Sequence, residues 1–234
     1  MKKIIISSAV FIALIMATGF SSGQSVEKET RDIKDFTRIS FGVPGNLYVY
    51  FSPDYKVVLE GEKAVLEDIV TEVSGDKLVI KKENWRLNLN EKVTVYITMP
   101  GINGLGVSGS GKAEIKDAVK ADNLGLSVSG SGKLYTADIV ATDINCSISG
   151  SGDIIIGGSG NSSSANISIS GSGNYRGELL RIGTVKISIS GSGNCSCNVS
   201  ESLKASVSGS GNVTYLGNPK VDARVSGSGR VKSK

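Results

Sequence analysis

The side chains that could carry chemistry in this sequence are acidic residues near the middle of the chain. Glycoside-cleaving enzymes use two carboxylates, one as general acid and the other as base or nucleophile. The candidates here are Asp122, Asp138, Asp143 and Asp153, with Lys112 and Lys133 nearby. They are scattered over adjacent repeats, and the positions around them vary too much to shape a cleft. We therefore expect no catalytic residues and no enzyme, and we keep a polysaccharide lyase or hydrolase as the alternative.

Absent and rare residue types narrow the chemistry further. The sequence has no histidine, which excludes Ser-His-Asp and Cys-His catalysis and zinc held by histidine. Among its three cysteines, Cys195 and Cys197 would share one face of a strand with Cα atoms about 6.5–7 Å apart, at or beyond disulfide reach. We expect these two and Cys146 to be buried thiols, and we expect no cofactor and no metal site. The formal charge of +4 is small and no basic stripe is present, so no nucleic-acid partner is expected.

The elements that would position any site are set by the tetrapeptide Ser-Gly-Ser-Gly, which occurs seven times. The steps between copies are 21, 20, 21, 20, 18 and 18 residues. A fixed period of about 20 residues is typical of a solenoid, in which each repeat is one coil stacked on the last. The copies begin at Ser108, Ser129, Ser149, Ser170, Ser190, Ser208 and Ser226.

The residues before each tetrapeptide alternate as in a strand. The preceding residue is always Val or Ile, the residue three positions before is always apolar, and the residue between them is Gly or Ser in all but one copy, where it is Arg224. This period of two predicts a short strand that ends in a glycine-rich corner. We therefore predict an all-β protein, a parallel β-helix of coils of about 20 residues with Ser-Gly-Ser-Gly corners. A third apolar cluster predicts a further strand in each coil, at Ala121, Ile139, Leu179, Leu203 and Val221.

Outward-facing serines form the candidate contact surface. Stacked coils would align them into a flat sheet of hydroxyls able to meet a glycan, a cell-surface protein or a second copy of the chain. The alternative is that small side chains merely suit crowded ladders, and a more remote one is an ice-binding surface. The tentative contact residues are Ser127, Ser129, Ser147, Ser149, Ser168, Ser170, Ser188, Ser190, Ser206 and Ser208.

The corners themselves indicate structure rather than a ligand site. Their glycines fit a turn with positive φ, and Asn174, Asn194 and Asn212, which follow three successive corners, predict a ladder of hydrogen-bonded amides. Calcium-binding β-rolls require an acidic residue every nine residues, and only Asp153 follows a tetrapeptide in that way. The shorter last steps predict tighter final coils with shorter returns.

The N-terminal part of the chain predicts export. Residues 1–23 combine two lysines, an apolar run and the small residues Ser21-Ser22-Gly23, which indicates a signal peptide cleaved before Gln24. No second long apolar segment exists and no cysteine follows the run, so neither a transmembrane segment after cleavage nor a lipoprotein anchor is expected. We expect an exported protein of the periplasm, the outer surface or the extracellular space.

Residues 24–100 predict a β-rich section that caps the solenoid of residues 101–234 and is continuous with it. Its aromatic residues Phe36, Phe41, Phe51 and Trp85 are expected in the core or over the open end of the first coil. The alternative is a sugar-stacking platform of Trp85 beside Arg86 and Lys82.

The segment Pro100-Gly101-Ile102-Asn103, followed by the seven tetrapeptides, resembles a bacterial family of secreted proteins. This is the auto-transporter adhesin, head GIN domain family, and the resemblance runs from about Ile33 to the end of the chain. It implies a parallel β-helix in an exported protein, with an adhesin-like binding or scaffold role. It brings no catalytic or ligand motif.

Overall fold

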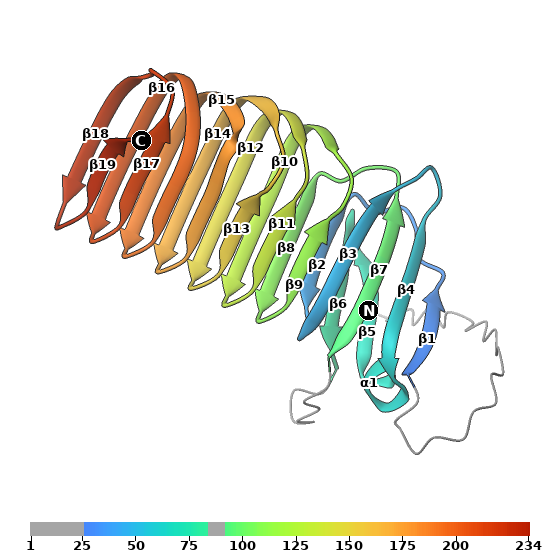
Figure 1. Ribbon diagram of the computed structural model, residues 1–234. Helices are drawn as coiled ribbons and strands as arrows, with labels where there is room; N and C mark the ends of the chain where they lie inside the picture. Colours follow the sequence, from blue (N-terminus) through green and yellow to red (C-terminus); the bar gives the residue numbers. More distant parts are fainter. Residues whose placement is uncertain (1–25, 84–91) are drawn as a thin grey trace, which may run out of the picture.

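The chain folds into an elongated stack of β-coils, which Figure 1 shows from the side. The structure is a computed structural model and describes residues 26–83 and 92–234. Its regular structure is nearly all β, and the parallel pairing of one coil on the next confirms the predicted parallel β-helix. The predicted signal peptide, together with Trp85 and Arg86 of the sugar-platform alternative, lies outside the described residues.

A repeating coil consists of a long strand, a tetrapeptide corner and a short strand. One such coil is made by β10 (Val119–Gly130) and β11 (Lys133–Thr136). The next, made by β12 (Ile139–Gly150) and β13 (Asp153–Ile156), pairs with it in parallel. The other strands of the stack are β8 (Gly104–Gly109), β9 (Lys112–Ile115), β14 (Gly160–Gly171), β15 (Asn174–Gly191), β16 (Asn194–Gly209), β17 (Asn212–Leu216), β18 (Lys220–Ser226) and β19 (Arg230–Ser233).

Each long strand curves over one edge of the stack (Figure 1). The register between β10 and β12 is interrupted at this bend, where Asp122 and Thr142 are left out of the pairing. A coil therefore has three straight segments, two in the long strand and one in the short strand, as the three apolar clusters of the repeat predict.

The core is a continuous column of the inward-facing apolar side chains. The Val or Ile before each tetrapeptide is at most 2% exposed from Val107 to Val207, whereas Val225 in the final coil is 42% exposed. The difference arises because no described coil covers β18 on its far side. Burial in this column depends on the neighbouring coils, as expected for a solenoid.

The tetrapeptide corner requires glycine at its second position. The first glycine of every copy has positive φ, for example +115° at Gly171. A Cβ atom placed on Gly171 would lie 2.5 Å from the carbonyl oxygen of Gly150 in the preceding coil. The coils thus stack too closely for any side chain there, which confirms the structural role predicted for the corner.

The N-terminal section enters the stack out of sequence order. β2 (Arg38–Gly42) lies between β6 (Lys77–Lys82) and β8, and it pairs in parallel with both. Likewise β3 (Gly45–Phe51) lies between β7 (Val93–Met99) and β9. The β2–β3 unit is therefore an inner coil that precedes its outer neighbour in the sequence.

Antiparallel strands close the N-terminal end of the stack. β4 (Lys56–Glu62) pairs with β7, and β1 (Val26–Arg31) pairs with β4. β5 (Ile69–Ser74) pairs with β6 and is joined to β4 by the short helix α1 (Lys63–Glu67). Phe36 and Phe41 are fully buried here, as expected, and Phe51 is partly buried against the core. No helix in this part or elsewhere in the described residues is long and apolar enough to cross a membrane.

The shortening of the last coils occurs in the return between corners. The pairing of β15 with β16 leaves out residues 178–180, so the later coil makes the same passage with fewer residues. This confirms the predicted shorter returns. The inward position expected for Leu179 is wrong, because its side chain is 61% exposed on this bulge and Leu180 is buried instead.

Candidate functional site

The predicted serines lie in two parallel rows on the outside of the stack. Ser127, Ser147, Ser168, Ser188 and Ser206 pair in register from β10 to β16, and so do Ser129, Ser149, Ser170, Ser190 and Ser208. All ten side chains are exposed, and together we call them the serine strip. Their alternation with buried Val and Ile explains why every one points outward.

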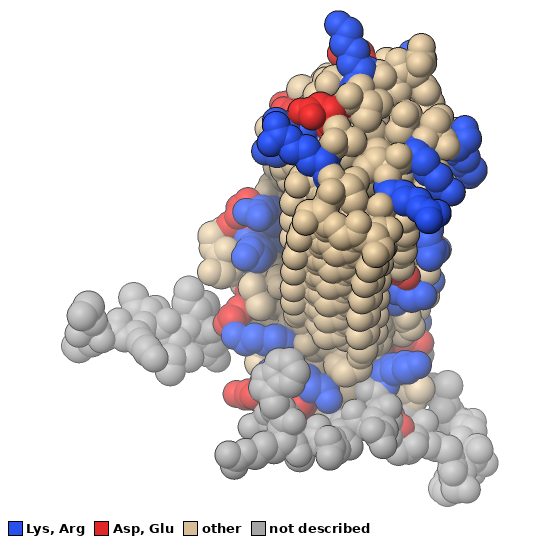
Figure 2. All heavy atoms as spheres, turned by 90° about the vertical axis from the view of Figure 1, so that its left-hand side faces the viewer, with Lys and Arg blue, Asp and Glu red and all other residues tan. Residues whose placement is uncertain are grey.

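The serine strip is an uncharged surface on a rigid support. Its ten members carry no charge. Figure 2 shows that the side of the stack that faces left in Figure 1, where the long strands end, is an evenly stepped area without Lys, Arg, Asp or Glu, with blue Lys and Arg side chains on both flanks. Because adjacent coils hold the backbone by continuous parallel pairing, the hydroxyls keep a spacing of about 4.8 Å along the stack.

A groove lies where the first serine row reaches the N-terminal section. At the position of the first serine row, the coil of β8 has Gly106, which pairs with Ser127. The row two residues earlier along the strands has Gly104 and Gly125, which pair with each other. These glycines form the floor of a groove with a volume of about 510 Å³. The Arg38 side chain lies over Gly104, where a Cβ atom would come within 3.1 Å of the guanidinium Nε.

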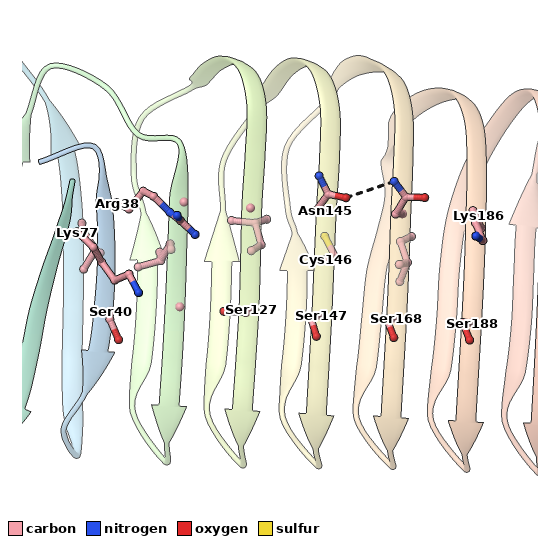
Figure 3. A pocket seen from close by; sticks show the side chains of 18 residues that line it. Arg38, Ser40, Lys77, Ser127, Asn145, Cys146, Ser147, Ser168, Lys186 and Ser188 are labelled. Atoms are coloured by element: carbon pink, nitrogen blue, oxygen red, sulfur yellow. Dashed lines mark hydrogen bonds between the residues drawn. The ribbon is translucent and has the colours of Figure 1, made fainter. Parts of the chain in front are cut away.

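In the part of the chain that the structure describes, three cations line this groove and no acidic residue does. Arg38 and Lys77 lean into it from β2 and β6, and Lys186 lies at the opposite end on β15 (Figure 3). Between them are Asn145 and Asn166, whose amides are joined by a hydrogen bond of 3.2 Å donated by Asn166. The groove therefore offers positive charge and hydrogen-bond donors to a ligand.

Sequence reasoning found the serines but not this groove. Aligning the repeats would have revealed the glycines at 104, 106 and 125, since they replace polar residues of later copies. Arg38 and Lys77 gave no such signal, because they belong to the section without the tetrapeptide and reach the groove only through the insertion of β2.

The four candidate acids do not form one cluster. Asp143 on β12 accepts a hydrogen bond from Ser164, whereas Asp153 on β13 accepts one of 2.8 Å from Asn174 and lies 3.6 Å from the Lys133 ammonium. Asp122 and Asp138 are exposed at bends of their coils. Within residues 26–83 and 92–234, no group of three potential metal-ligating side chains occurs.

The asparagines after the corners form the predicted ladder. The Asn194 amide donates to Asn174 at 2.9 Å, and the Asn212 amide donates to Asn194 at 3.1 Å. Each amide is used by the next coil, which supports a structural role. In the sugar-platform alternative, Lys82 is the described member, and its side chain is buried.

The cysteines are free and buried, as predicted. Burial raises the pKa of the Cys146 thiol to about 12, and it also raises the pKa of Cys195. Both are therefore protonated at neutral pH and poor nucleophiles. The fully buried Tyr175 lies next to Cys195 in the register, and burial raises its pKa as well.

Comparisons with known proteins agree with this architecture. A putative adhesin from Bacteroides fragilis has a TM-score of 0.84 and 26% identity, over 92% of this chain and 100% of that one. A putative adhesin from Parabacteroides merdae (TM-score 0.69, 20% identity, 89% of this chain and 96% of that one) shares the fold. A putative lipid binding protein from Parabacteroides distasonis also shares the fold, with a TM-score of 0.73 and 21% identity over 89% of this chain and 96% of that one.

No curated protein matches the chain. The model of one protein family, however, matches residues 35–219, which is most of the sequence and includes the inserted β2–β3 coil as well as the repeats. The chain therefore belongs to the family described as "Putative auto-transporter adhesin, head GIN domain".

Proposed function

We propose that this protein is an exported, non-catalytic binding protein of the cell envelope or cell surface, with the serine strip as its contact surface. The observation that carries the proposal is the register of the two serine rows, which hold ten exposed hydroxyls on one rigid face. The adhesin label of the family and of the Bacteroides fragilis structure supports the same role.

The strip suits binding for physical reasons. Serine loses little side-chain entropy on binding, because it has a single rotatable bond to a small group. The backbone beneath it is fixed by pairing on both sides, so little ordering cost remains to be met when a partner docks. Each hydroxyl can both donate and accept a hydrogen bond, which matches the hydroxyls of a sugar polymer.

The positions and contacts of the acidic residues favour a binding role over a catalytic one. Asp143 and Asp153 lie on different segments of the coil, and each is engaged with a neighbour in the adjacent coil. General acid–base catalysis of glycoside cleavage needs two carboxyl groups on either side of one bond. The polysaccharide-processing alternative therefore has no observation in its favour.

A glycan array probed with the mature chain tests the proposal. We expect binding that is lost in the Ser149→Gln/Ser170→Gln variant, because two longer side chains would stand up from the strip. Thr142→Gln/Ser163→Gln is the matched control: these residues are exposed in the same two coils, but at the bends. A protein that binds no glycan and no envelope protein would contradict the proposal, and so would equal loss in both variants.

Self-association and location need separate measurements. Size-exclusion chromatography with light scattering, repeated on the Ser149→Gln/Ser170→Gln variant, would show whether the partner is a second copy. N-terminal sequencing of the protein from cell-envelope and culture fractions tests export, and we expect Gln24 as the first residue. Recovery of the intact N-terminus from the cytoplasm would contradict it.

A further inference from the structure

One register row of the stack carries cations at both ends of the groove and none between. Arg38 pairs with Lys77 on one side and with Gly104 on the other, and the groove reaches along the row to Lys186. The members that line the groove are, in order, Lys77, Arg38, Gly104, Gly125, Asn145, Asn166 and Lys186. Beyond the groove the row continues to Lys204 and Asp222, which form an ion pair with each other. Five strand spacings separate Arg38 from Lys186, which is about 24 Å.

Within residues 26–83 and 92–234, these cations have no acidic ion-pair partner. The ion pairs among the described residues involve other lysines and arginines, and no acidic residue lines the groove. Arg38 and Lys186 are exposed and Lys77 is half-buried, so their charges face solvent. An anion bound here would gain attraction without first displacing a carboxylate.

Side chains that can form hydrogen bonds line much of the groove between the cations. Ser127, Ser147 and Ser168 provide hydroxyls, and Asn145 and Asn166 provide amides. Beside them Gly125 leaves room for a chain to lie close to the backbone, because the nearest heavy atom to a built Cβ is 3.8 Å away. At Gly104 and Gly106 the Arg38 and Ser127 side chains occupy the corresponding space. The groove is therefore long, it carries hydroxyl and amide groups along part of its floor, and its ends are positive.

From this arrangement we infer that the groove binds an acidic polysaccharide along the stack axis, with its carboxylate or sulfate groups on Arg38, Lys77 and Lys186. The inference rests on the proposed binding function and names its ligand class. A small anion would use one end only, whereas an extended polymer can reach the cations at both ends. Its sugar hydroxyls meet the serine and asparagine side chains between them.

The composition of the groove argues against two other anionic partners. Its aliphatic side chains, such as Ile39, Leu126 and Ile167, face the core and are at most 2% exposed, so the groove has no pocket of aliphatic side chains into which the acyl chain of a lipid could insert. Among the described residues no aromatic side chain lines it, so these residues offer no stacking platform of the kind that single-stranded nucleic acids use. An acidic polysaccharide needs neither an apolar site for acyl chains nor an aromatic stacking platform.

Binding to dextran sulfate and polygalacturonate, with uncharged dextran as the comparison polymer, tests the inference by calorimetry or biolayer interferometry. We expect both acidic polymers to bind, dextran to bind far more weakly, and the affinity to fall as salt is raised, because exposed charges are screened. Single-stranded DNA and vesicles containing phosphatidylglycerol serve as competitors. If either binds as tightly through the same cations, the assignment to polysaccharide is overturned.

Two kinds of variant separate this groove from charge in general. Arg38→Gln/Lys186→Gln should weaken binding at least about tenfold, since it removes charges at both ends. Lys120→Gln/Arg181→Gln removes two exposed cations that share another row of the same stack and should change little. If Arg38→Gln disturbs folding, Lys77→Gln/Lys186→Gln repeats the test. Equal loss in the test and control pairs overturns the inference.

Filling the groove gives a test that leaves the charge unchanged. Gly125→Gln has room for its Cβ and should abolish binding by blocking the floor, whereas Gly101→Gln, outside the groove, should not. Acidic binding that survives Gly125→Gln overturns the groove as its site. If glycan binding is lost only in Ser149→Gln/Ser170→Gln, the proposed function stands and this inference fails; if no glycan or envelope partner binds, both fail.

Discussion

The hydroxyl of Tyr175 is the clearest polar defect in the core. The residue is fully buried, and its Oη atom has no hydrogen-bond partner among the described residues. The hydroxyl fits because Gly177 leaves the space open; a Cβ there would lie 2.6 Å from it. A buried hydroxyl without a partner loses its hydrogen bonds to water on folding, so it costs stability.

Tyr175→Phe should therefore stabilise the protein by about 1 kcal/mol, because it removes this uncompensated hydroxyl and leaves the ring in place. Differential scanning calorimetry or urea unfolding measures the change. Tyr135→Phe is the control, since that ring is only half-buried and lies beside the Lys112 ammonium. A Tyr175→Phe protein less stable than the wild type would mean that the hydroxyl is satisfied.

The buried thiols predict a loss of stability at alkaline pH. Burial holds the pKa of Cys146 at about 12 in the folded protein, above its ordinary value of 9.0. Between these values the unfolded chain loses a proton that the folded chain keeps, so rising pH favours unfolding. The cost for one thiol is about 1 kcal/mol at pH 10.

Urea unfolding between pH 7 and pH 10 would measure this dependence. Cys146→Ala should be less stable at pH 7, because it leaves a cavity, but should lose less stability on going to pH 10. In parallel, a thiol reagent at pH 8 should label the native protein slowly and the unfolded chain rapidly. Rapid labelling of Cys146 in the native state would show that the thiol is accessible.

At the residue scale, the correct predictions were those that followed from the alternation of inward-facing and outward-facing positions along a strand. A serine between two buried β-branched residues has to face outward, and a cysteine at an inward position has to be buried, so both could be read from the sequence. Arg38 could not be assigned to a site in this way. Its neighbours Gly104 and Lys77 are distant in sequence, and no repeat pattern links them.

Among the elements, the tetrapeptide corner determines how closely coils approach. The corner backbone of one coil lies directly against that of the next, and the hydrogen bonds between them repeat along the stack, as from Ser172 N–H to Gly150 O at 2.8 Å. This contact leaves no space for a Cβ at Gly171. The corner thus sets the coil spacing, and the serine strip depends on that spacing.

Gly171→Ala should destabilise the protein by at least about 2 kcal/mol, since alanine at positive φ is strained and its Cβ meets a backbone oxygen. Gly125→Ala, whose Cβ has open space, should be neutral or stabilising by up to about 1 kcal/mol. Thermal unfolding of both proteins gives the comparison. Equal stability of the two variants would show that the corner can relax.

The repeated elements could be predicted, and the irregular ones could not. Seven copies of one pattern fixed the strand, the corner and the inward face, because an error in one copy is corrected by the others. The bulge at residues 178–180 occurs once, so nothing in the pattern indicated that Leu179 would be exposed. The order of coils in the N-terminal section was also hidden, since pairing of β2 with β8 joins distant segments.

On the scale of the whole molecule, the two ends of the stack differ. Antiparallel strands cover the N-terminal end, whereas the final coil of β18 and β19 is paired on one side only among the described residues. Stability in a solenoid is close to a sum over neighbouring coils. Loss of the final coil therefore removes one interface, but loss of an inner coil removes two and separates what remains.

Two deletions, one of the final coil and one of an inner coil, test this difference in stability. A chain ending at Pro219 loses β18 and β19 and should still unfold cooperatively, with a lower Tm, because β16 and β17 then form the last coil. Deletion of residues 26–55 removes the edge strand β1 and the β2–β3 coil from between β6–β7 and β8–β9. These coils would be left about 10 Å apart, two strand spacings, with the core between them open to water. We expect this protein to lose its cooperative transition in circular dichroism and to aggregate. If it instead unfolded as cooperatively as the C-terminal truncation, the β2–β3 coil would be dispensable for the stability of the stack.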